Sequence, residues 1–269
     1  MPTLRPGSRQ IDAVRFSAAG VGPRREEIAE EVPVALIYNR FPFAVMLATP
    51  TDLEDFAVGF SLTEGIVGEV GEISEIKTKV TDEGVEVAMT VTKDRYMLLR
   101  ERHRRNLVAG SSCGLCGSDS FAEALRPVDA VVSQQSFTPQ AIHRAMAEFP
   151  ALQVLNREVG AFHGAAFADG DGRITVVRED IGRHNALDKL IGFLARNAID
   201  RQAGFVAVSS RCSYEMVRKT AAAGIPLIAT ISAPTSLAIR FAEDTGVGLV
   251  AFARESRFNL YATASRISR

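Results

Sequence analysis

The chain has few cysteines, no tryptophan and almost no net charge. Three cysteines occur in 269 residues, too few and odd in number for the disulfide framework of a small secreted domain. Lysine and arginine total 31 against 32 aspartate and glutamate residues, a formal net charge of −1. The composition therefore lacks the basic character of a general nucleic-acid binder, and we expect no nucleic acid among its partners.

Long apolar runs are also missing. No run approaches the ~20 residues of a membrane span, and the first residues are polar, unlike the apolar core of a signal peptide. We therefore expect a soluble, cytoplasmic protein with no membrane partner. A hydrophobic content of 46% over 269 residues is enough for one large domain or two ordinary ones.

Two of the three cysteines, Cys113 and Cys116, lie in the stretch Ser111-Ser-Cys-Gly-Leu-Cys-Gly117. Its glycines indicate an open loop that exposes sulfur. A block of positive charge, Arg100-Glu-Arg-His-Arg-Arg105, lies just upstream. The block either places positive charge beside the cysteine loop or forms the solvent-exposed face of its own segment. Cationic neighbours favour thiolate over thiol, so the pattern indicates a reactive site.

Four interpretations of this Cys-x-x-Cys motif stay open. Half of a zinc site needs further ligands, which would come from His103, His163, His184 or Cys212. A thioredoxin-type redox pair is expected to open a helix directly after a strand, which the serines and glycines here disfavour. A sulfur carrier would hold sulfane sulfur on one thiolate as a persulfide, and the fourth interpretation is a structural loop without chemistry.

The first half has the pattern of a mixed α/β unit. Apolar, β-leaning runs predict strands over residues 28–38, 43–48, 75–80 and 85–91. Asn39-Arg40 is a candidate hairpin turn between the first two. Thr51 and Glu54 have capping-box spacing and predict a helix that ends near Gly65. Residues 93–105 fit either a strand or a helix.

The second half alternates strands and helices. Thr138-Pro139 opens a helix to about residue 149. A hairpin is expected over 161–168 and 173–177, followed by helices over 185–197, 214–223 and 235–245 and strands over 204–209, 226–231 and 247–253. Such alternation predicts a largely parallel sheet with helices on both faces.

Three polar loops follow successive strands, at residues 178–185, 209–213 and 232–236. Ligands of open α/β sheets bind beyond the carboxyl ends of the strands. Each loop leads into a helix N-terminus, which favours anions, and Arg178, Arg183 and Arg211 suit bidentate phosphate contacts. Ser213 and Thr235 fit ordinary N-caps equally well, and His184 fits a structural histidine. Together the loops predict a site for a phosphorylated, nucleotide-like ligand.

Several motifs in a fixed order resemble the FdhD family of formate dehydrogenase accessory sulfurtransferases. The longest is Arg178-Glu-Asp-Ile-Gly-Arg-His-Asn-Ala-Leu-Asp-Lys189, which occurs together with Ser112-Cys-Gly-Leu-Cys-Gly117. Further matching stretches lie at residues 49–52, 59–60, 63–65, 210–213, 215–217, 223–226, 232–238, 252–254 and 259–261. The resemblance covers nearly the whole chain from about residue 30.

The resemblance implies an α/β fold with two domains. An N-terminal α+β domain would span residues 1–126 and end in the Cys-x-x-Cys loop. A C-terminal cytidine-deaminase-like three-layer domain would span residues 127–269, and the protein would form a homodimer. Deaminase zinc chemistry is not expected, because the His-x-Glu and Pro-Cys-x-x-Cys signature is missing.

The resemblance also implies a function. A cysteine desulfurase would deliver sulfur to Cys113 as a persulfide, with Cys116 as the partner thiol. The sulfur would pass to the molybdenum cofactor, in its bis-molybdopterin guanine dinucleotide form, before insertion into formate dehydrogenase. GDP would mimic this cofactor. The alternative is a non-catalytic chaperone whose cysteines bind zinc or are structural.

Cofactor-binding residues are expected on the polar loops and at one upstream histidine, whereas no metal ligands are expected. The expected set is Arg178, Asp180, Arg183, His184, Asn185, Ser210, Arg211, Ser213, Ser232, Thr235 and His163. Cys212 stands alone in an apolar-flanked loop and is expected to be a small pocket residue that sulfur loading does not need.

Overall fold

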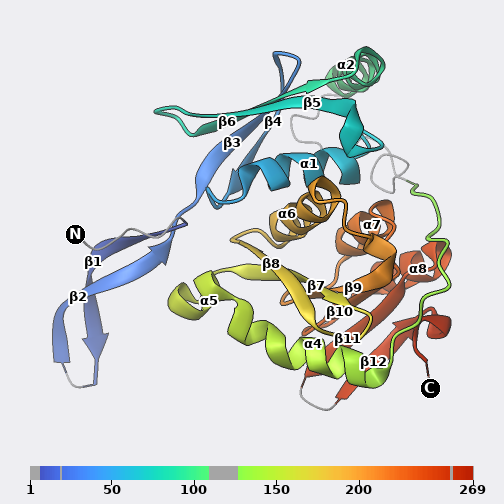
Figure 1. The fold of residues 1–269 in the computed structure, drawn as a ribbon. Coiled ribbons are helices and arrows are strands. Elements are labelled where there is room, and N and C mark those ends of the chain that lie inside the picture. Colours follow the sequence, from blue (N-terminus) through green and yellow to red (C-terminus); the bar gives the residue numbers. More distant parts are fainter. Residues whose placement is uncertain (1–6, 19, 109–126, 255–256, 269) are drawn as a thin grey trace.

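The computed structural model describes residues 7–18, 20–108, 127–254 and 257–268, and only the backbone of residues 102–108. These residues form a two-stranded, a four-stranded and a six-stranded sheet. The four-stranded and six-stranded sheets belong to one body, and the two-stranded ribbon projects from it (Figure 1). None of the helices in the described ranges is both long and apolar enough to cross a membrane.

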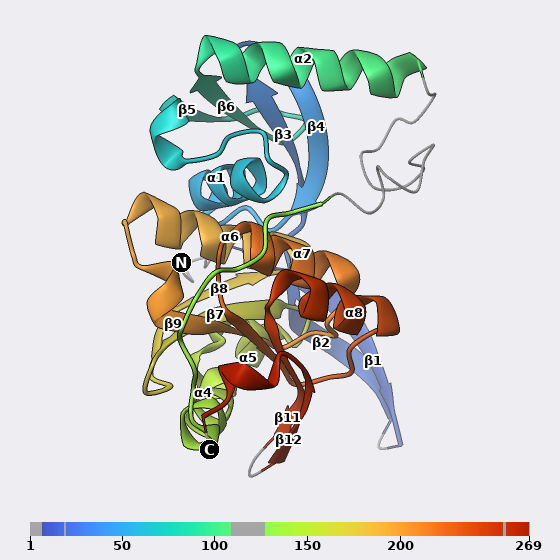
Figure 2. The same cartoon turned by 90° about the vertical axis from the view of Figure 1, so that its right-hand side faces the viewer.

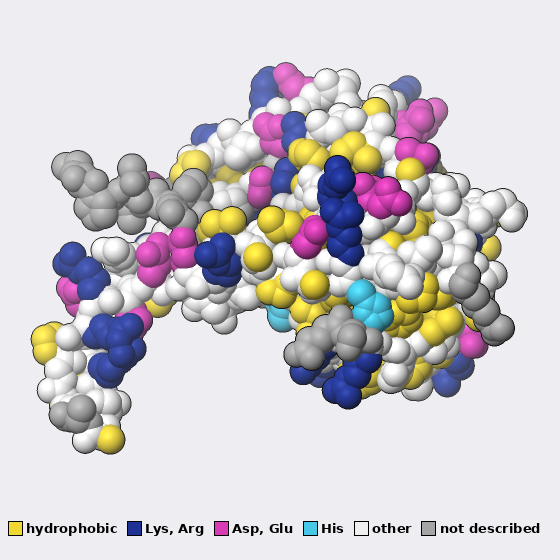
Figure 3. Space-filling view, turned by 60° about the horizontal axis from the view of Figure 1, so that its bottom comes forward, with side chains coloured by type: hydrophobic (Ala, Val, Ile, Leu, Met, Phe, Trp, Pro, Cys, Tyr) yellow, Lys and Arg dark blue, Asp and Glu magenta, His cyan; other side chains and the backbone are white. Residues whose placement is uncertain are grey.

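The ribbon is an antiparallel hairpin of β1 (Ser8–Ser17) and β2 (Gly20–Ala29). Figure 3 shows it standing away from the body, with apolar side chains on its surface. Val14, Phe16 and Val21 are all more than half exposed. The sequence pattern predicts no hairpin here, because charged and apolar residues mix on both faces of the ribbon.

The four-stranded sheet has the order β4-β3-β6-β5. Its elements are β3 (Val32–Tyr38), β4 (Phe41–Ala48), β5 (Ile73–Val80) and β6 (Val85–Val91). Helix α1 (Leu53–Thr63) separates this sheet from the larger one, and α2 (Lys93–Val108) lies at its far end (Figure 2). Asn39 and Arg40, with φ of 48° and 68°, form the tight turn between β3 and β4.

The six-stranded sheet has the order β12-β11-β10-β9-β7-β8. Its strands are β7 (His163–Asp169), β8 (Ile174–Asp180), β9 (Gly204–Val208), β10 (Leu227–Thr230), β11 (Gly248–Arg254) and β12 (Arg257–Ala262). Strands β9, β10 and β11 are parallel neighbours, whereas β7 is antiparallel to both β8 and β9, and β12 to β11. Strand β8 therefore points the same way as β9–β11, and four carboxyl ends share one edge.

The expectation of a largely parallel sheet is wrong, because three of its five strand pairs are antiparallel: β7 with β8, β7 with β9, and β11 with β12. Strand β7 lies between β8 and β9 and runs against both. The hairpin predicted over residues 161–168 and 173–177 is confirmed by β7 and β8, since the tight turn at residues 170–173 joins only antiparallel strands. The antiparallel insertion leaves the shared carboxyl edge intact.

Helices cover both faces of this sheet, giving a three-layer, deaminase-like unit. Helices α4 (Pro139–Leu152) and α5 (Val154–Val159) lie on one side, with α6 (Arg183–Arg196), α7 (Tyr214–Ala222) and α8 (Ser236–Thr245) on the other. Alternation along β9 serves both layers. Val206 and Val208 pack in the α6–α8 core, and Phe205 and Ala207 in the α4 core.

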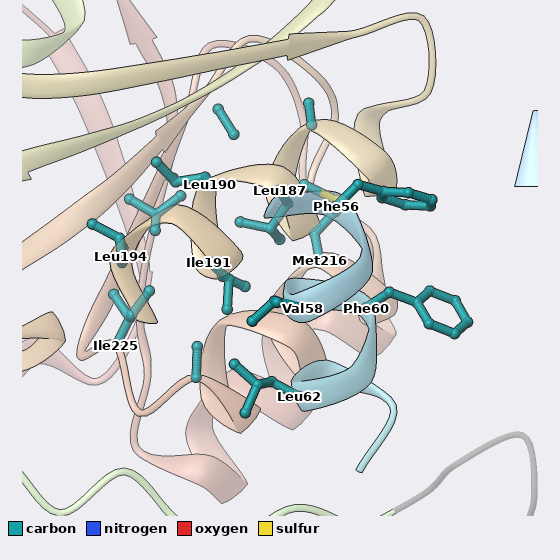
Figure 4. Close-up of a cluster of buried hydrophobic side chains, with 14 of the residues drawn as sticks. Phe56, Val58, Phe60, Leu62, Leu187, Leu190, Ile191, Leu194, Met216 and Ile225 are labelled. Atoms are coloured by element: carbon teal, nitrogen blue, oxygen red, sulfur yellow. The ribbon is translucent and has the colours of Figure 1, made fainter. Parts of the chain in front are cut away.

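Helices α1 and α6 pack closely and join the two larger sheets (Figure 4). A Cβ atom at Gly59 would lie 1.8 Å from the carbonyl oxygen of Asp188, and one at Gly192 would lie 1.8 Å from that of Asp55. The backbones are therefore in direct contact at these glycines. The buried cluster around Phe56, Leu187 and Ile191 extends without interruption from one sheet to the other.

A buried ionic network connects α1, α6 and α7. Lys219 Nζ lies 2.9 Å from Asp188 Oδ2 and 3.0 Å from Glu64 Oε1, and it also donates to Thr63 Oγ1 at 2.9 Å. Arg218 pairs with the same Glu64 carboxylate. All five side chains are buried, so the ions compensate one another where water does not reach.

The predicted helix caps and strand bounds are confirmed in some places and wrong in others. The capping box at Thr51 is wrong: Asp52 is the N-cap, with φ of 52°, and its side chain makes no capping hydrogen bond. Thr51 Oγ1 instead accepts a hydrogen bond from Lys189 Nζ at 3.4 Å. The Thr138 cap is confirmed by its hydrogen bond from Ala141 N at 3.1 Å. The run 28–38 is divided, since β2 ends at Ala29 and β3 begins at Val32.

The charged segment 93–105 is helical and belongs to α2. Arg100 lies over the Phe41 ring at 4.9 Å and donates to the Tyr96 hydroxyl at 3.3 Å. This arginine therefore packs on the four-stranded sheet. The arrangement of the block against the cysteine loop lies outside the described residues.

Candidate anion-binding site

The loops after β8, β9 and β10 occupy the shared carboxyl edge of the six-stranded sheet. The second and third are joined by backbone hydrogen bonds, from Cys212 N to Ala233 O at 3.1 Å and from Thr235 N to Cys212 O at 3.0 Å. Ser209 Oγ accepts from Gly164 N at 2.8 Å and ties the end of β9 to the start of β7. The edge thus brings together the N-termini of α6, α7 and α8.

Positive charge gathers around His163, at the start of β7. Burial is the main cause that lowers the pKa of this histidine below its ordinary value. The nearby charges of Arg183, His184 and Arg211 lower it further, and Asp180 acts in the opposite direction. Two arginines and two histidines from β7, α6 and the β9–α7 loop therefore share one electrostatic environment.

Much of this charge has no acidic counterpart within the described ranges. Neither Arg183 nor Arg211 has an acidic partner among the residues that the structure describes. The Nε atom of Arg183 is buried and lacks a hydrogen-bond acceptor there, and Arg211 is exposed. Buried donors normally have partners. An anion at the edge would supply the missing acceptors.

His184 has one acidic neighbour. Its Nε2 atom lies 2.9 Å from Glu215 Oε2, in the first turn of α7, and each side chain is about one-quarter exposed. The contact with His184 is the main reason that the pKa of Glu215 is lowered. The sequence analysis missed Glu215, although an acidic residue in a first helical turn is a recognisable signal. Glu215 therefore places one carboxylate beside the imidazole at the rim of the cationic cluster.

The four predicted hydroxyl residues differ in availability. Thr235 caps α8 through a hydrogen bond from Ala238 N at 3.2 Å, as its N-cap interpretation requires. Ser210 Oγ donates a hydrogen bond to Arg211 O at 3.0 Å. Ser232 is half-buried, and its backbone N–H donates a hydrogen bond to Thr230 Oγ1. Ser213 is the N-cap residue of α7, yet its buried Oγ has no partner in the described part of the chain. Ser213 is the hydroxyl best placed to turn toward a ligand.

Three predicted ligand residues are engaged inside the protein. Asp180 pairs with Lys189 Nζ at 2.7 Å, with both side chains fully buried, and accepts from Thr49 N at 3.0 Å. Asn185 Nδ2 donates to Asp180 Oδ1 and to a β4 carbonyl. Arg178 contacts Asp55 Oδ2 at 2.8 Å and lies over an α6 aromatic ring. We assign these side chains to the scaffold, because their polar atoms already have protein partners.

The scaffold also includes residues that motif reasoning overlooked. Lys189 donates to the carbonyl of Thr49 at 3.0 Å, and Thr49 Oγ1 accepts from Ile181 N at 3.1 Å. A lysine that ends the 178–189 run and a threonine before α1 give no sequence signal of contact. Their pairing fixes the β8–α6 loop against the first half of the chain.

The cysteines fall into two groups. Cys113 and Cys116 lie outside the described residues. Cys212 is fully buried, and burial raises the pKa of its thiol to about 12. It therefore stays a neutral, weakly nucleophilic thiol near neutral pH. The described ranges contain no cluster of three or more histidine, cysteine, aspartate or glutamate residues suited to a metal ion.

Fold and site together define a deaminase-like α/β protein with positive charge gathered at one edge of its larger sheet. The sequence profile of the FdhD/NarQ family matches residues 29–268. The chain therefore belongs to the FdhD/NarQ family.

The chain also matches individual relatives in sequence and structure over most of its length. The chain is 46% identical over 242 residues to the sulfur carrier protein FdhD of Cupriavidus necator, covering 90% of this chain and 84% of that one. It is 45% identical over 265 residues to the sulfur carrier protein FdhD of Xanthomonas euvesicatoria, covering 98% and 94%. A crystal structure from Desulfotalea psychrophila, assigned as a formate dehydrogenase accessory protein, superposes with a TM-score of 0.77 at 26% identity, over 98% and 100% of the two chains.

Proposed function

We propose that this protein is a sulfurtransferase that serves formate dehydrogenase. A cysteine desulfurase loads Cys113 with sulfur, and the protein passes it to the bis-molybdopterin guanine dinucleotide form of the molybdenum cofactor, held at the cationic edge. The names of its relatives support the sulfur-carrier role. The proposal includes a cytoplasmic homodimer divided into domains near residues 126 and 127.

One observation carries the binding half of the proposal: at the N-termini of α6 and α7, Arg183 and Arg211 have no acidic partner among the described residues. Arg183 and Arg211 point to a dianionic or polyanionic group, since guanidinium binds phosphate bidentately. The helix N-termini add free amides, and the buried Ser213 hydroxyl has no hydrogen-bond partner in the part of the chain that the structure describes. A cofactor that carries guanosine diphosphate units supplies the matching phosphates.

The loading step is a thiol–persulfide exchange, in which one S–S bond forms and another breaks. The Cys113 thiolate attacks the terminal sulfur of a persulfide on the desulfurase, forming a new S–S bond. The S–S bond of the donor breaks, and the donor cysteine leaves as a thiolate. Cys113 then carries the sulfur as a persulfide, and Cys116 lies close enough in sequence to act as the partner thiol.

GDP binding tests the site. We expect GDP to bind the wild type in calorimetry and to bind Arg211→Ala about tenfold or more weakly, because one charged hydrogen bond contributes roughly 1.5–3 kcal/mol. Arg173→Ala is the matched control, since Arg173 is exposed in the β7–β8 turn at the opposite edge. Equal affinities for wild type and Arg211→Ala would move the phosphate site elsewhere.

Sulfur loading tests the carrier role. After incubation with a desulfurase and cysteine, mass spectrometry should find the added sulfur on Cys113, and Cys113→Ala should abolish formate dehydrogenase activation. Cys212→Ser should load like the wild type, because its buried thiol is neutral. A Cys113→Ala protein that still gains sulfur and fully activates the dehydrogenase would reject the assignment. GDP binding without any sulfur loading would instead support a non-catalytic chaperone.

A further inference from the structure

A pocket lies where the C-terminal ends of α1 and α6 come together. Its volume is about 340 Å³, within the range of small-molecule sites. Leu62 lines it from the last turn of α1, and Leu194 and Ala195 line it from the last turn of α6. Ala195 is twelve residues from Arg183, or roughly 18 Å along the helix. The pocket is therefore separate from the anion-binding edge.

The walls of this pocket are mostly apolar. Leu62 and Leu194, both labelled in Figure 4, are buried in the core that joins the two large sheets. Val70 and Ile199 also line the pocket, and they are half-buried against the same core. A hydrocarbon group placed here would leave water and contact side chains from both halves of the chain.

One cation, Arg201, lines the pocket. It begins the short 3-10 helix η2 (Arg201–Ala203) and is half-buried. Within the described ranges its guanidinium has neither a hydrogen bond nor an ion pair, and the neighbouring Asp200 carboxylate instead accepts from Gln202 N at 2.9 Å. Burial lowers the pKa of Arg201, which Asp200 opposes, yet arginine stays charged. A partly desolvated charge without an acceptor costs free energy that a bound anion would recover.

A second charged residue favours a ligand with a single negative charge. Glu69 is exposed and lines the same pocket, and these two described side chains form no ion pair with each other. Phosphate as a dianion would bring two negative charges to one guanidinium, and Glu69 would repel the excess. A carboxylate carries one charge and accepts two parallel hydrogen bonds from arginine.

We propose that this pocket binds a monocarboxylate with a short apolar chain. The carboxylate pairs with Arg201, and the chain lies against Leu62, Leu194 and Ile199. The site does not depend on the proposed sulfur transfer or on the nucleotide site. Because the ligand contacts both halves of the folded chain and has no such pocket in the unfolded chain, it should raise the melting temperature.

Three small molecules separate the contributions of charge and chain. We expect 4-methylpentanoate to bind the wild type in calorimetry and to raise its melting temperature. Acetate keeps the charge without the chain, and 4-methylpentan-1-ol keeps the chain without the charge, so each should bind at least about tenfold more weakly. Butanoate should fall between acetate and 4-methylpentanoate, because each buried methylene strengthens binding about fourfold. Equal affinities for 4-methylpentanoate and the alcohol would overturn the role of Arg201.

A substitution tests the arginine directly. Arg201→Gln should bind 4-methylpentanoate about tenfold or more weakly and should still fold, because no ion pair is lost within the described ranges. Its unliganded melting temperature checks the fold. Arg173→Gln is the matched control, since Arg173 is exposed in the β7–β8 turn, and it should bind like the wild type. Undiminished binding by Arg201→Gln, or no binding by the wild type, would overturn the proposal.

GDP provides the last control. The two sites lie at opposite ends of α6, so saturating GDP should leave the affinity for 4-methylpentanoate unchanged. Competition between the two ligands would place the carboxylate at the anion-binding edge and overturn the separate pocket.

Discussion

The run from residue 178 to residue 189 sets side chains of opposite roles next to one another. Asp180 and Lys189 form a fully buried pair, and Asn185 Nδ2 donates a hydrogen bond to Asp180 Oδ1. Arg183 and His184, between them in sequence, face the cationic edge. A single motif therefore both anchors the loop and exposes its charge.

At the residue scale, the protonation of His163 should report on the site. Burial and then the neighbouring cations lower the pKa of His163, so the unfolded chain binds this proton more tightly than the folded protein. The histidine then has no effect on stability well above its unfolded pKa of about 6.5 and destabilises the fold progressively below it. We expect His163→Gln to reduce the loss of unfolding free energy as the pH falls below about 6.5, measured by urea denaturation.

Anion binding should shift the same pKa upward. Pyrophosphate beside Arg183 and Arg211 would offset the positive charges that disfavour imidazolium, so ligand binding should raise the pKa of His163. An NMR titration with and without pyrophosphate measures this, with His143 on α4 as internal control. A His163 titration that pyrophosphate leaves unchanged contradicts the placement of the anion.

At the element scale, the contact between α1 and α6 depends on two glycines. Gly192→Ala should destabilise the protein by about 1–3 kcal/mol or more, because its Cβ would overlap the carbonyl of Asp55 and force the helices apart. Gly22→Ala is the matched control, since a Cβ at Gly22 meets nothing within 4 Å. Denaturant unfolding compares the two. Equal stabilities would show that the helices separate at little cost.

At the scale of the whole molecule, the two large sheets share one hydrophobic core. Buried residues from β3, α1, α6 and β9 belong to the same cluster, and the Lys219–Asp188–Glu64 network crosses the same boundary. Separating the proposed domains would expose apolar surface and buried charge together. We therefore expect one cooperative transition in calorimetry. Two well-separated transitions would show that the halves fold independently.

The sequence by itself determined the alternation of strands and helices after residue 160. It also determined the three polar loops that follow strands within this region. These features depend on local patterns: apolar periodicity, turn residues and helix N-terminal residues. Because strands β8, β9 and β10 point the same way, their loops necessarily share an edge. The order of the motifs likewise indicated the family, and the profile match shows that the chain belongs to it.

Only the tertiary structure decided which polar side chains remain available at that edge. Asp180 meets Thr49 across 131 positions of sequence, and Arg178 meets Asp55 across 123. No local pattern encodes such partners, so scaffold and ligand-facing residues look alike in the sequence.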